Sequence, residues 1–207
     1  MKTHFVKLRA GNLRGFWLNG ALAGMVLLTM APVTSLGNDS AIPDEIPVCF
    51  DFSCKSRMTV SLNIEDWRDV YELFEHNESA LQERDNIKQA IAVMEYLVGQ
   101  YTPTHRDIAR NWSKKYQELA ELPGQMDCIE QSINTTTYLR LLEQAGLLKY
   151  HRVLDRAYRK SLIDQHWAAE VADIHSGQHY VIDSWFADNG EAPIMVKSER
   201  WYKLSWF

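Results

Sequence analysis

Hydrophobic residues recur at intervals of three and four through the middle of the chain, and this spacing predicts amphipathic helices. The first helix is expected to begin after Asn63, which can form a capping box with Asp66, and to run to about Glu75. The second is expected over residues 79–100, because Pro103 follows directly as a stop signal.

Two further helices are expected by the same criterion. One covers residues 104–122 and is more polar, and Pro123 and Gly124 end it. The other covers residues 127–145, where apolar positions favour burial on one side and Gly146 provides a C-terminal stop.

Later in the chain the hydrophobic pattern changes to the alternation that is typical of strands. Strands are expected over residues 55–63, 150–158, 166–174, 180–186 and 194–206. Helices followed by hairpin-connected strands indicate an α+β fold, with N-terminal helices packed on a C-terminal antiparallel sheet.

The N-terminal segment differs from the rest of the chain. Residues 1–37 contain four basic residues, no acidic ones and an apolar run beginning at Phe16, which is typical of an export signal or an N-terminal membrane anchor through residues 16–33. We therefore expect a periplasmic or otherwise exported protein. Small residues at Ser35 and Gly37 favour cleavage there, residues 38–48 are interpreted as a linker, and residues 49–207 as one domain.

Composition and charge narrow the possible partners. The chain is 46% hydrophobic and 24% charged, which is ordinary for a globular domain, and its net charge is −5. Removing residues 1–37 would take away four positive charges and make the net charge more negative by four. Nucleic-acid binding is therefore not expected.

The three cysteines fall into a pair and a single residue. Cys49 and Cys54 are close enough in sequence to form a disulfide in an oxidising compartment. Cys128 then remains, either as a reactive thiol or as a buried, inert one.

Cys128 stands at the expected start of a helix. Asp127 and Glu130 have the spacing of a capping box, which places Cys128 at the first helical position. The positive helix end favours a thiolate there, whereas the two acidic neighbours oppose it. A nucleophilic role for Cys128 therefore requires a histidine partner.

His166 and Asp183 provide that partner and its orienting acid if the strands pair suitably. With an even loop in the hairpin at residues 174–177, both side chains lie on one face of the sheet, and Asp183 pairs with Ala168. An odd loop would place them on opposite faces.

The expected roles follow from triad chemistry: Cys128 attacks a carbonyl, His166 transfers the proton and Asp183 orients the imidazole. The backbone N–H of Cys128 would be one oxyanion donor. The second donor is left open among Gln125, Gln117 and Trp112. No cofactor is expected, and no metal site either, because no histidine cluster has zinc-ligand spacing.

These residues resemble the transglutaminase-like superfamily, with its papain-like core, over about residues 110–190. The segments 166–171 and 180–183 look like its His and Asp strands, and the spacing suits its compact bacterial exported members. The resemblance implies a cysteine hydrolase of the peptidase or amidase type, which acts through a thioester on a peptide or protein of the cell envelope. The residues after Cys128 depart from the usual pattern, so the substrate is left open.

Two other functions use the same fold. One is a non-catalytic envelope binding or assembly module in which Cys128 is structural, and which the acidic neighbours of that cysteine favour. The other is acyl transfer to an amine in place of water, as in transglutaminases.

Overall fold

The computed structural model describes residues 45–111, 122–160 and 165–203. The chain divides into two units, residues 1–37 and 38–207, and every described residue belongs to the second. The predicted export segment, most of the linker, and the oxyanion candidates Trp112 and Gln117 lie outside the described residues. Within the described ranges, no helix has the length and apolar character needed to span a membrane.

The N-terminal part of the second unit contains a small hairpin and two helices. Strands β1 (Ile46–Phe50) and β2 (Ser56–Val60) pair antiparallel. Helices α1 (Ile64–Glu72) and α2 (Ala80–Gly99) follow. The capping box predicted between Asn63 and Asp66 is confirmed.

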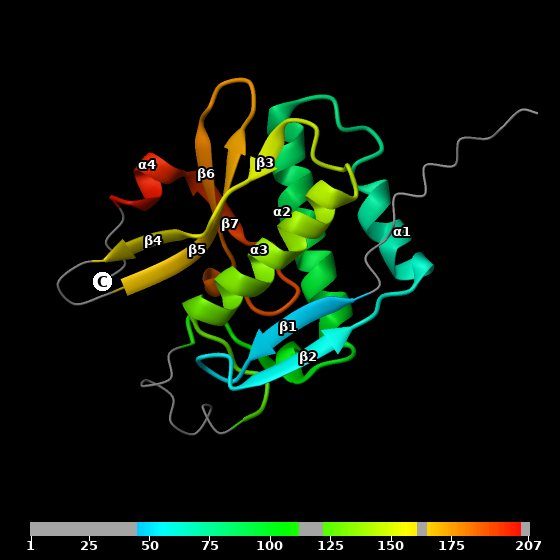
Figure 1. Cartoon of the computed structure of the whole chain (residues 1–207), viewed down its shortest axis with the longest axis vertical. Helices are drawn as coiled ribbons and strands as arrows, with labels where there is room; N and C mark the ends of the chain where they lie inside the picture. The colour runs from blue at the N-terminus through cyan, green and yellow to red at the C-terminus, as the bar shows by residue number, and fades with distance from the viewer. Residues whose placement is uncertain (1–44, 112–121, 161–164, 204–207) are drawn as a thin grey trace, which may run out of the picture. The chain divides into compact units, whose positions relative to one another are not determined.

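The C-terminal part is built from one long helix and a five-stranded antiparallel sheet (Figure 1). Helix α3 (Cys128–Gln144) precedes the strands, which have the order β3-β5-β6-β7, with β4 paired to the beginning of β5. The strands are β3 (His151–Val153), β4 (Ala157–Lys160), β5 (Gln165–Asp173), β6 (His179–Asp183) and β7 (Ile194–Lys197). The predicted α+β content with antiparallel sheets is confirmed.

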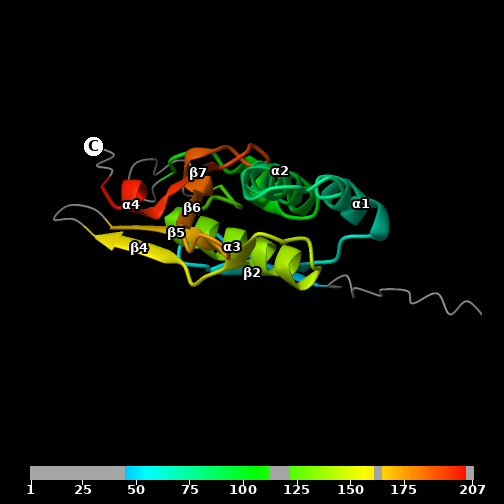
Figure 2. The same ribbon diagram turned by 90° about the horizontal axis from the view of Figure 1, so that it is seen from above.

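Helix α3 lies between the two sheets and contacts β1 on one side and β5 on the other (Figure 1 and Figure 2). Asn134 joins it to β1, because its side chain accepts a hydrogen bond from the Cys49 N–H at 3.0 Å and donates one to the Cys49 carbonyl at 2.8 Å. Tyr138, Leu139 and Leu142 bury the same helix in the main core. These contacts fix the position of α3, whose first residue is Cys128.

The predicted helix over residues 104–122 is wrong for its described part. A short 3-10 helix, η1 (Pro103–Arg106), ends there, and Asp107 is extended. The Asp107 carboxyl group accepts hydrogen bonds from the Met126 N–H at 2.8 Å and from the Gln131 amide at 2.6 Å. Arg110 has a φ of 59°, which a helix does not allow. Tertiary contacts of Asp107 thus override the helical spacing.

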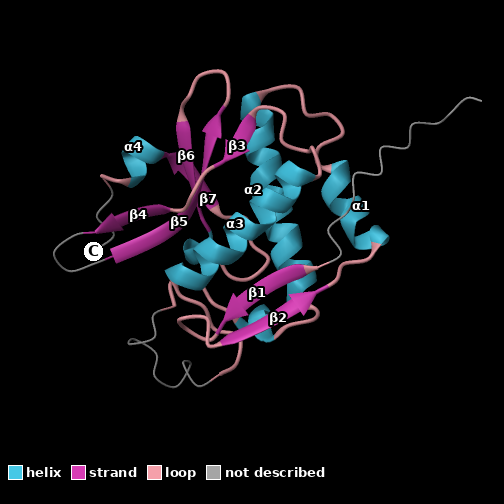
Figure 3. Cartoon of the chain, in the orientation of Figure 1, coloured by secondary structure: helices cyan, strands magenta, loops and turns pink. Residues whose placement is uncertain are grey.

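Other predicted boundaries also change (Figure 3). Strand β1 begins at Ile46, within the predicted linker. The strand expected over residues 150–158 is split into β3 and β4, because their registers against β5 differ by one residue. The sheet strands expected to reach residues 186 and 206 stop early, and the 3-10 helix η2 (Ser184–Phe186) and helix α4 (Ser198–Trp201) replace their ends.

Candidate active site

The β5–β6 hairpin brings His166 and Asp183 to one face of the sheet. Ala169 pairs with Ile182 and Ala172 with His179, so the same register, continued by one step, pairs Ala168 with Asp183. This is the register of a four-residue hairpin loop between β5 and β6. Of the two alternatives, an even or an odd loop, the structure thus has the even one, which places both side chains on one face.

The two side chains form a buried hydrogen-bonded dyad. His166 Nε2 lies 2.8 Å from Asp183 Oδ2, and the residues are 3% and 1% exposed. Because an ionised carboxylate only accepts hydrogen bonds, Nε2 carries the proton and Nδ1 is left as the basic nitrogen. This is the orientation that a general base next to a nucleophile needs.

Aromatic rings enclose the dyad. The Trp201 indole Nε1 donates a second hydrogen bond to Asp183 Oδ2 at 2.9 Å. The ring centroids of Trp185, Phe186 and Trp201 lie 5.0, 5.9 and 5.8 Å from that of His166. These rings shield the dyad from water, and a shielded hydrogen bond to a carboxylate is stronger than an exposed one.

Cys128 is the first residue of α3, as the capping pattern predicted. Asp127 Oδ1 accepts a hydrogen bond from the Ile129 N–H at 2.8 Å, and Glu130 Oε2 accepts one from the Asp127 N–H at 3.0 Å. The thiol belongs to no disulfide and is partly exposed to solvent. The side chain therefore stands at the positive end of a 17-residue helix.

The acidic neighbours of Cys128 are not equivalent. Burial, together with the adjacent Glu130 carboxylate, raises the pKa of the Asp127 carboxyl well above its usual range. Below about pH 7 a proton on Asp127 removes negative charge beside Cys128, so there the two acids oppose a thiolate less than the sequence suggested.

Two sets of contacts connect α3 and the segment before it with the residues that directly follow Asp183. Thr135 lies seven residues, or two turns, after Cys128 and so on the same helix face, and its hydroxyl is 2.9 Å from that of Ser184, the residue after Asp183. The Trp185 indole donates to the Asn111 carbonyl at 2.9 Å, and the Asn111 amide donates to Gln125. The Cys128 segment and the dyad are thus held in the same region.

A disulfide loop supports the start of α3 from the other side. Cys49 and Cys54 form a disulfide, and the Cys54 N–H donates to Glu130 Oε1 at 2.8 Å. Asp51 binds the segment before the helix twice, through its N–H to the Gln125 carbonyl at 2.8 Å and through Oδ1 to the Gly124 N–H at 2.7 Å. The loop therefore binds both Glu130, within the capping box, and the segment that directly precedes Asp127.

Gln125 is the oxyanion candidate that lies within the described residues. Its side chain is 1% exposed, and its amide nitrogen donates to the Arg106 carbonyl at 2.8 Å. Its oxygen accepts from Asn111. These bonds give Gln125 a role in fixing the 106–111 segment beside the site. They assign it no role as an oxyanion donor.

The described residues contain one group with metal-binding spacing, Cys49, Cys54 and Glu130. Its two sulfur atoms are joined in the disulfide and are not thiolate ligands. The donor set therefore does not fit a metal ion.

Sequence reasoning missed Trp201 as a partner of Asp183. It placed Trp201 in a terminal strand, whereas the turn into α4 folds this residue under β6, fully buried against Ala168 and Val181. A hydrogen bond of this kind depends on a distant contact and leaves no local signal.

No protein-family model matches the chain, and no curated protein or solved structure shows a significant match to it. The resemblance to the transglutaminase-like superfamily therefore stays a prediction from the motifs.

Proposed function

We propose that the protein is an exported cysteine hydrolase that cleaves a peptide or amide bond through a Cys128–His166–Asp183 triad. The observation that carries this proposal is the buried 2.8 Å bond between His166 Nε2 and Asp183 Oδ2, which leaves Nδ1 as the basic nitrogen. The placement of Cys128 at the N-terminus of α3 supports its role as the nucleophile, because the positive helix end favours a thiolate.

The reaction divides into two steps with the same groups. His166 Nδ1 takes the thiol proton, Cys128 Sγ bonds to the carbonyl carbon, and the C–N bond breaks as the imidazolium returns the proton to the leaving amine. Water then adds to the thioester with His166 as base, and the carboxylic acid leaves while Cys128 regains its proton. The backbone N–H of Cys128 serves as one donor to the oxyanion.

Asp183 and the surrounding rings position the base. A carboxylate that accepts bonds from both His166 and Trp201 cannot rotate without losing one of them. The imidazole is held in one orientation and one tautomer, which is the contribution of the acid in such triads.

The function is tested by incubating the full-length chain with a complex peptide pool and detecting new termini by mass spectrometry. Wild type is expected to cleave a subset of peptides, and Cys128→Ala and His166→Ala to cleave none. The matched control is His175→Ala, which changes an exposed histidine in the 174–177 loop and should leave cleavage intact. Cleavage that persists in Cys128→Ala would refute the proposal.

Adding an ordinary primary alkylamine, such as a lysine derivative, to the same assay separates hydrolysis from acyl transfer. A hydrolase yields mainly free carboxylates in the presence of this amine, whereas an acyltransferase yields the substituted amide as the main product. The N-terminal segment is proposed as an export signal or membrane anchor. Because the site would then act after export, peptides of the cell envelope are the first substrates to include in the assay.

A further inference from the structure

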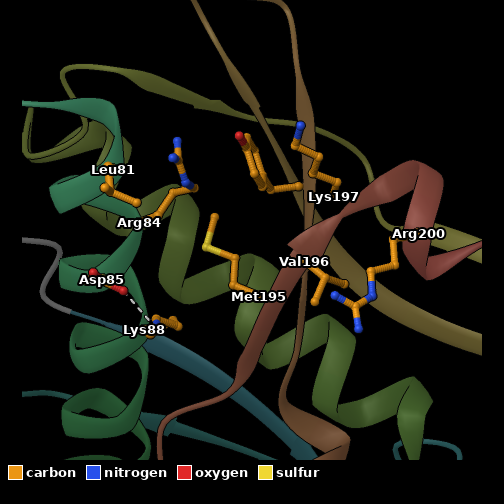
Figure 4. A pocket seen from close by; sticks show the side chains of 9 residues that line it. Leu81, Arg84, Asp85, Lys88, Met195, Val196, Lys197 and Arg200 are labelled. Carbon is orange, nitrogen blue, oxygen red and sulfur yellow. Dashed lines mark ion pairs between the residues drawn. The ribbon is translucent and has the colours of Figure 1, made fainter.

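A hollow in the unit lies between α2, β6, β7 and α4 (Figure 4). Its volume is about 470 Å³, which falls within the range of small-molecule sites. It is distinct from the candidate active site, since none of Cys128, His166 and Asp183 lines it.

The charge of this hollow is opposite to that of the chain. Four cationic side chains line it, against one acidic side chain, Asp85, whereas the chain carries a net charge of −5. Figure 4 shows that the cations come from two walls, with Arg84 and Lys88 on α2, Lys197 at the end of β7 and Arg200 on α4.

The cations on the two walls differ in what binds them. On α2, Lys88 pairs with Asp85 at 2.8 Å, and Arg84 lies 3.9 Å from Asp173 and stacks over the Tyr180 ring at 4.4 Å. Lys197 and Arg200 are exposed and form no ion pair with any residue that the structure describes. On α2, Lys88 is thus closely paired and Arg84 only loosely so, and Arg84, Lys197 and Arg200 are the cations that present charge to a ligand.

The rest of the lining is apolar. Met195 and Val196 form the β7 side between the cations, and Leu81 stands exposed on α2. A ligand that fills the hollow would place anionic oxygens against the cations and an apolar portion on these three side chains.

We propose that this hollow binds a phosphorylated organic ligand through Arg84, Lys197 and Arg200. A phosphate group carries about 1.5 to 2 negative charges and several acceptor oxygens, so it can bridge donors on both walls. One carboxylate offers a single charge and two oxygens, too few for this set of cations. Arginine is the side chain that best matches phosphate geometry.

The binding test uses isothermal titration calorimetry of the full-length chain with sodium pyrophosphate. One equivalent should bind, and the double variant Lys197→Gln/Arg200→Gln should weaken the affinity by about tenfold or more, because each lost charge-assisted bond weakens binding substantially. The matched control is Lys55→Gln/Arg57→Gln, which removes two exposed positive charges outside the hollow and should change the affinity less than about twofold.

The same variants identify the source of the phosphate. If phosphatidylglycerol vesicles, but not phosphatidylcholine vesicles, bind wild type and not Lys197→Gln/Arg200→Gln, the ligand is a lipid headgroup. If only pyrophosphate binds, the ligand is a free phosphorylated compound.

Failure to bind either probe, or equal weakening in both double variants, would overturn the proposal. Cys128→Ala should bind pyrophosphate as wild type does, so this result is independent of the proposed hydrolase activity.

Discussion

Asp183 is the residue on which the dyad depends, because it accepts hydrogen bonds from both His166 and Trp201. Both donors reach the same oxygen, Oδ2, from different elements of the fold. A buried acceptor with two donors fixes the direction of each of them, and this is why the imidazole can present Nδ1 in a constant orientation.

Asp183→Asn tests this role. The asparagine side chain can keep the shape of the site but offers an amide where a carboxylate is needed, so the wrong imidazole tautomer is favoured. We expect kcat/KM for peptide cleavage to fall by on the order of 10³-fold, with the circular dichroism spectrum unchanged. Asp155→Asn, on a fully exposed side chain, is the control and should leave kcat/KM as in wild type.

Gly124 is the other single residue on which the site depends. It has a φ of +97°, and a Cβ there would lie 2.0 Å from the Pro103 carbonyl oxygen. It precedes Cys128 by four residues, and its N–H is bound by Asp51. A side chain at this position would displace the segment that leads into α3.

Gly124→Ala is therefore expected to lower the free energy of unfolding by on the order of 3 kcal/mol, measured by urea denaturation. Gly146→Ala is the matched control: it also has positive φ, +70°, but nothing lies within 4 Å of the added Cβ. We expect that variant to lose only about 1 kcal/mol. Equal losses in the two variants would show that close approach at Gly124 is not the cause.

Among the elements, the three long helices were predictable, whereas the helix expected over residues 104–122 was wrong for its described part and the ends of the C-terminal strands were misplaced. Asn63, Ser79 and Asp127 cap α1, α2 and α3 by local hydrogen bonds, so sequence spacing alone located all three helices. The ends of β6 and β7 depend on where Trp185 and Trp201 are buried, which is decided by packing between distant segments.

In the candidate site, too, some features could be predicted from the local sequence and others could not. Cys128, His166 and Asp183 could be proposed from a helix cap and strand alternation, since both are local patterns. The contacts of Ser184 with Thr135, and of Trp201 with Asp183, join different elements and could not be read locally.

The disulfide loop joins β1 to β2 along the chain, and its hydrogen bonds link this hairpin to the start of α3. Four consecutive residues in it, Asp51 to Cys54, have φ between 32° and 63°, a region that residues other than glycine seldom adopt. The disulfide and the bonds of the loop to Glu130 and Gln125 hold it in this conformation.

Replacing both loop cysteines, as Cys49→Ala/Cys54→Ala, should lower the free energy of unfolding by about 2 kcal/mol through the lost chain constraint. The measurement is urea denaturation of the variant and of wild type without reductant. Adding reductant should lower wild type to the level of the variant and leave the variant unchanged. An unchanged urea midpoint in the variant would show that the loop does not depend on its disulfide.

Across the unit as a whole, buried acids set how stability depends on pH, and Glu95 and Asp107 act in the same direction as Asp127. Burial raises the pKa of Glu95 to about 8 and that of Asp107 to about 8. The sequence carried a signal for Glu95, which lies on the same face of α2 as the buried Ile91 and Val98. Both carboxyls are neutral in the folded protein under conditions where the unfolded chain ionises them.

The protein is therefore expected to be more stable at pH 5 than at pH 8. A carboxyl whose pKa is raised by folding contributes stability that is complete below its unfolded pKa and lost as the pH rises through the folded pKa. Burial is the largest single effect on the pKa of Glu83 and raises it, but hydrogen bonds from His151 and backbone amides together lower the pKa overall, so the stability that Glu83 contributes is lost only below this pH window. The melting temperature should fall by about 5 °C or more between pH 5 and pH 8.

Glu95→Gln supplies the control for that titration. The amide cannot ionise, so the fall in melting temperature between pH 5 and pH 8 should be clearly smaller than in wild type. A melting temperature that rises from pH 5 to pH 8 in wild type would contradict the assignment of these acids as neutral.

The triad itself is tested most directly by the rate at which iodoacetamide alkylates Cys128 as a function of pH, in wild type and in His166→Ala. A thiolate paired with an imidazolium should keep a nearly constant alkylation rate from pH 8 down to pH 6, whereas an ordinary thiol slows by about tenfold per pH unit. We expect the first behaviour in wild type and the second in His166→Ala, with His175→Ala as wild type. Identical pH profiles in wild type and His166→Ala would contradict the triad.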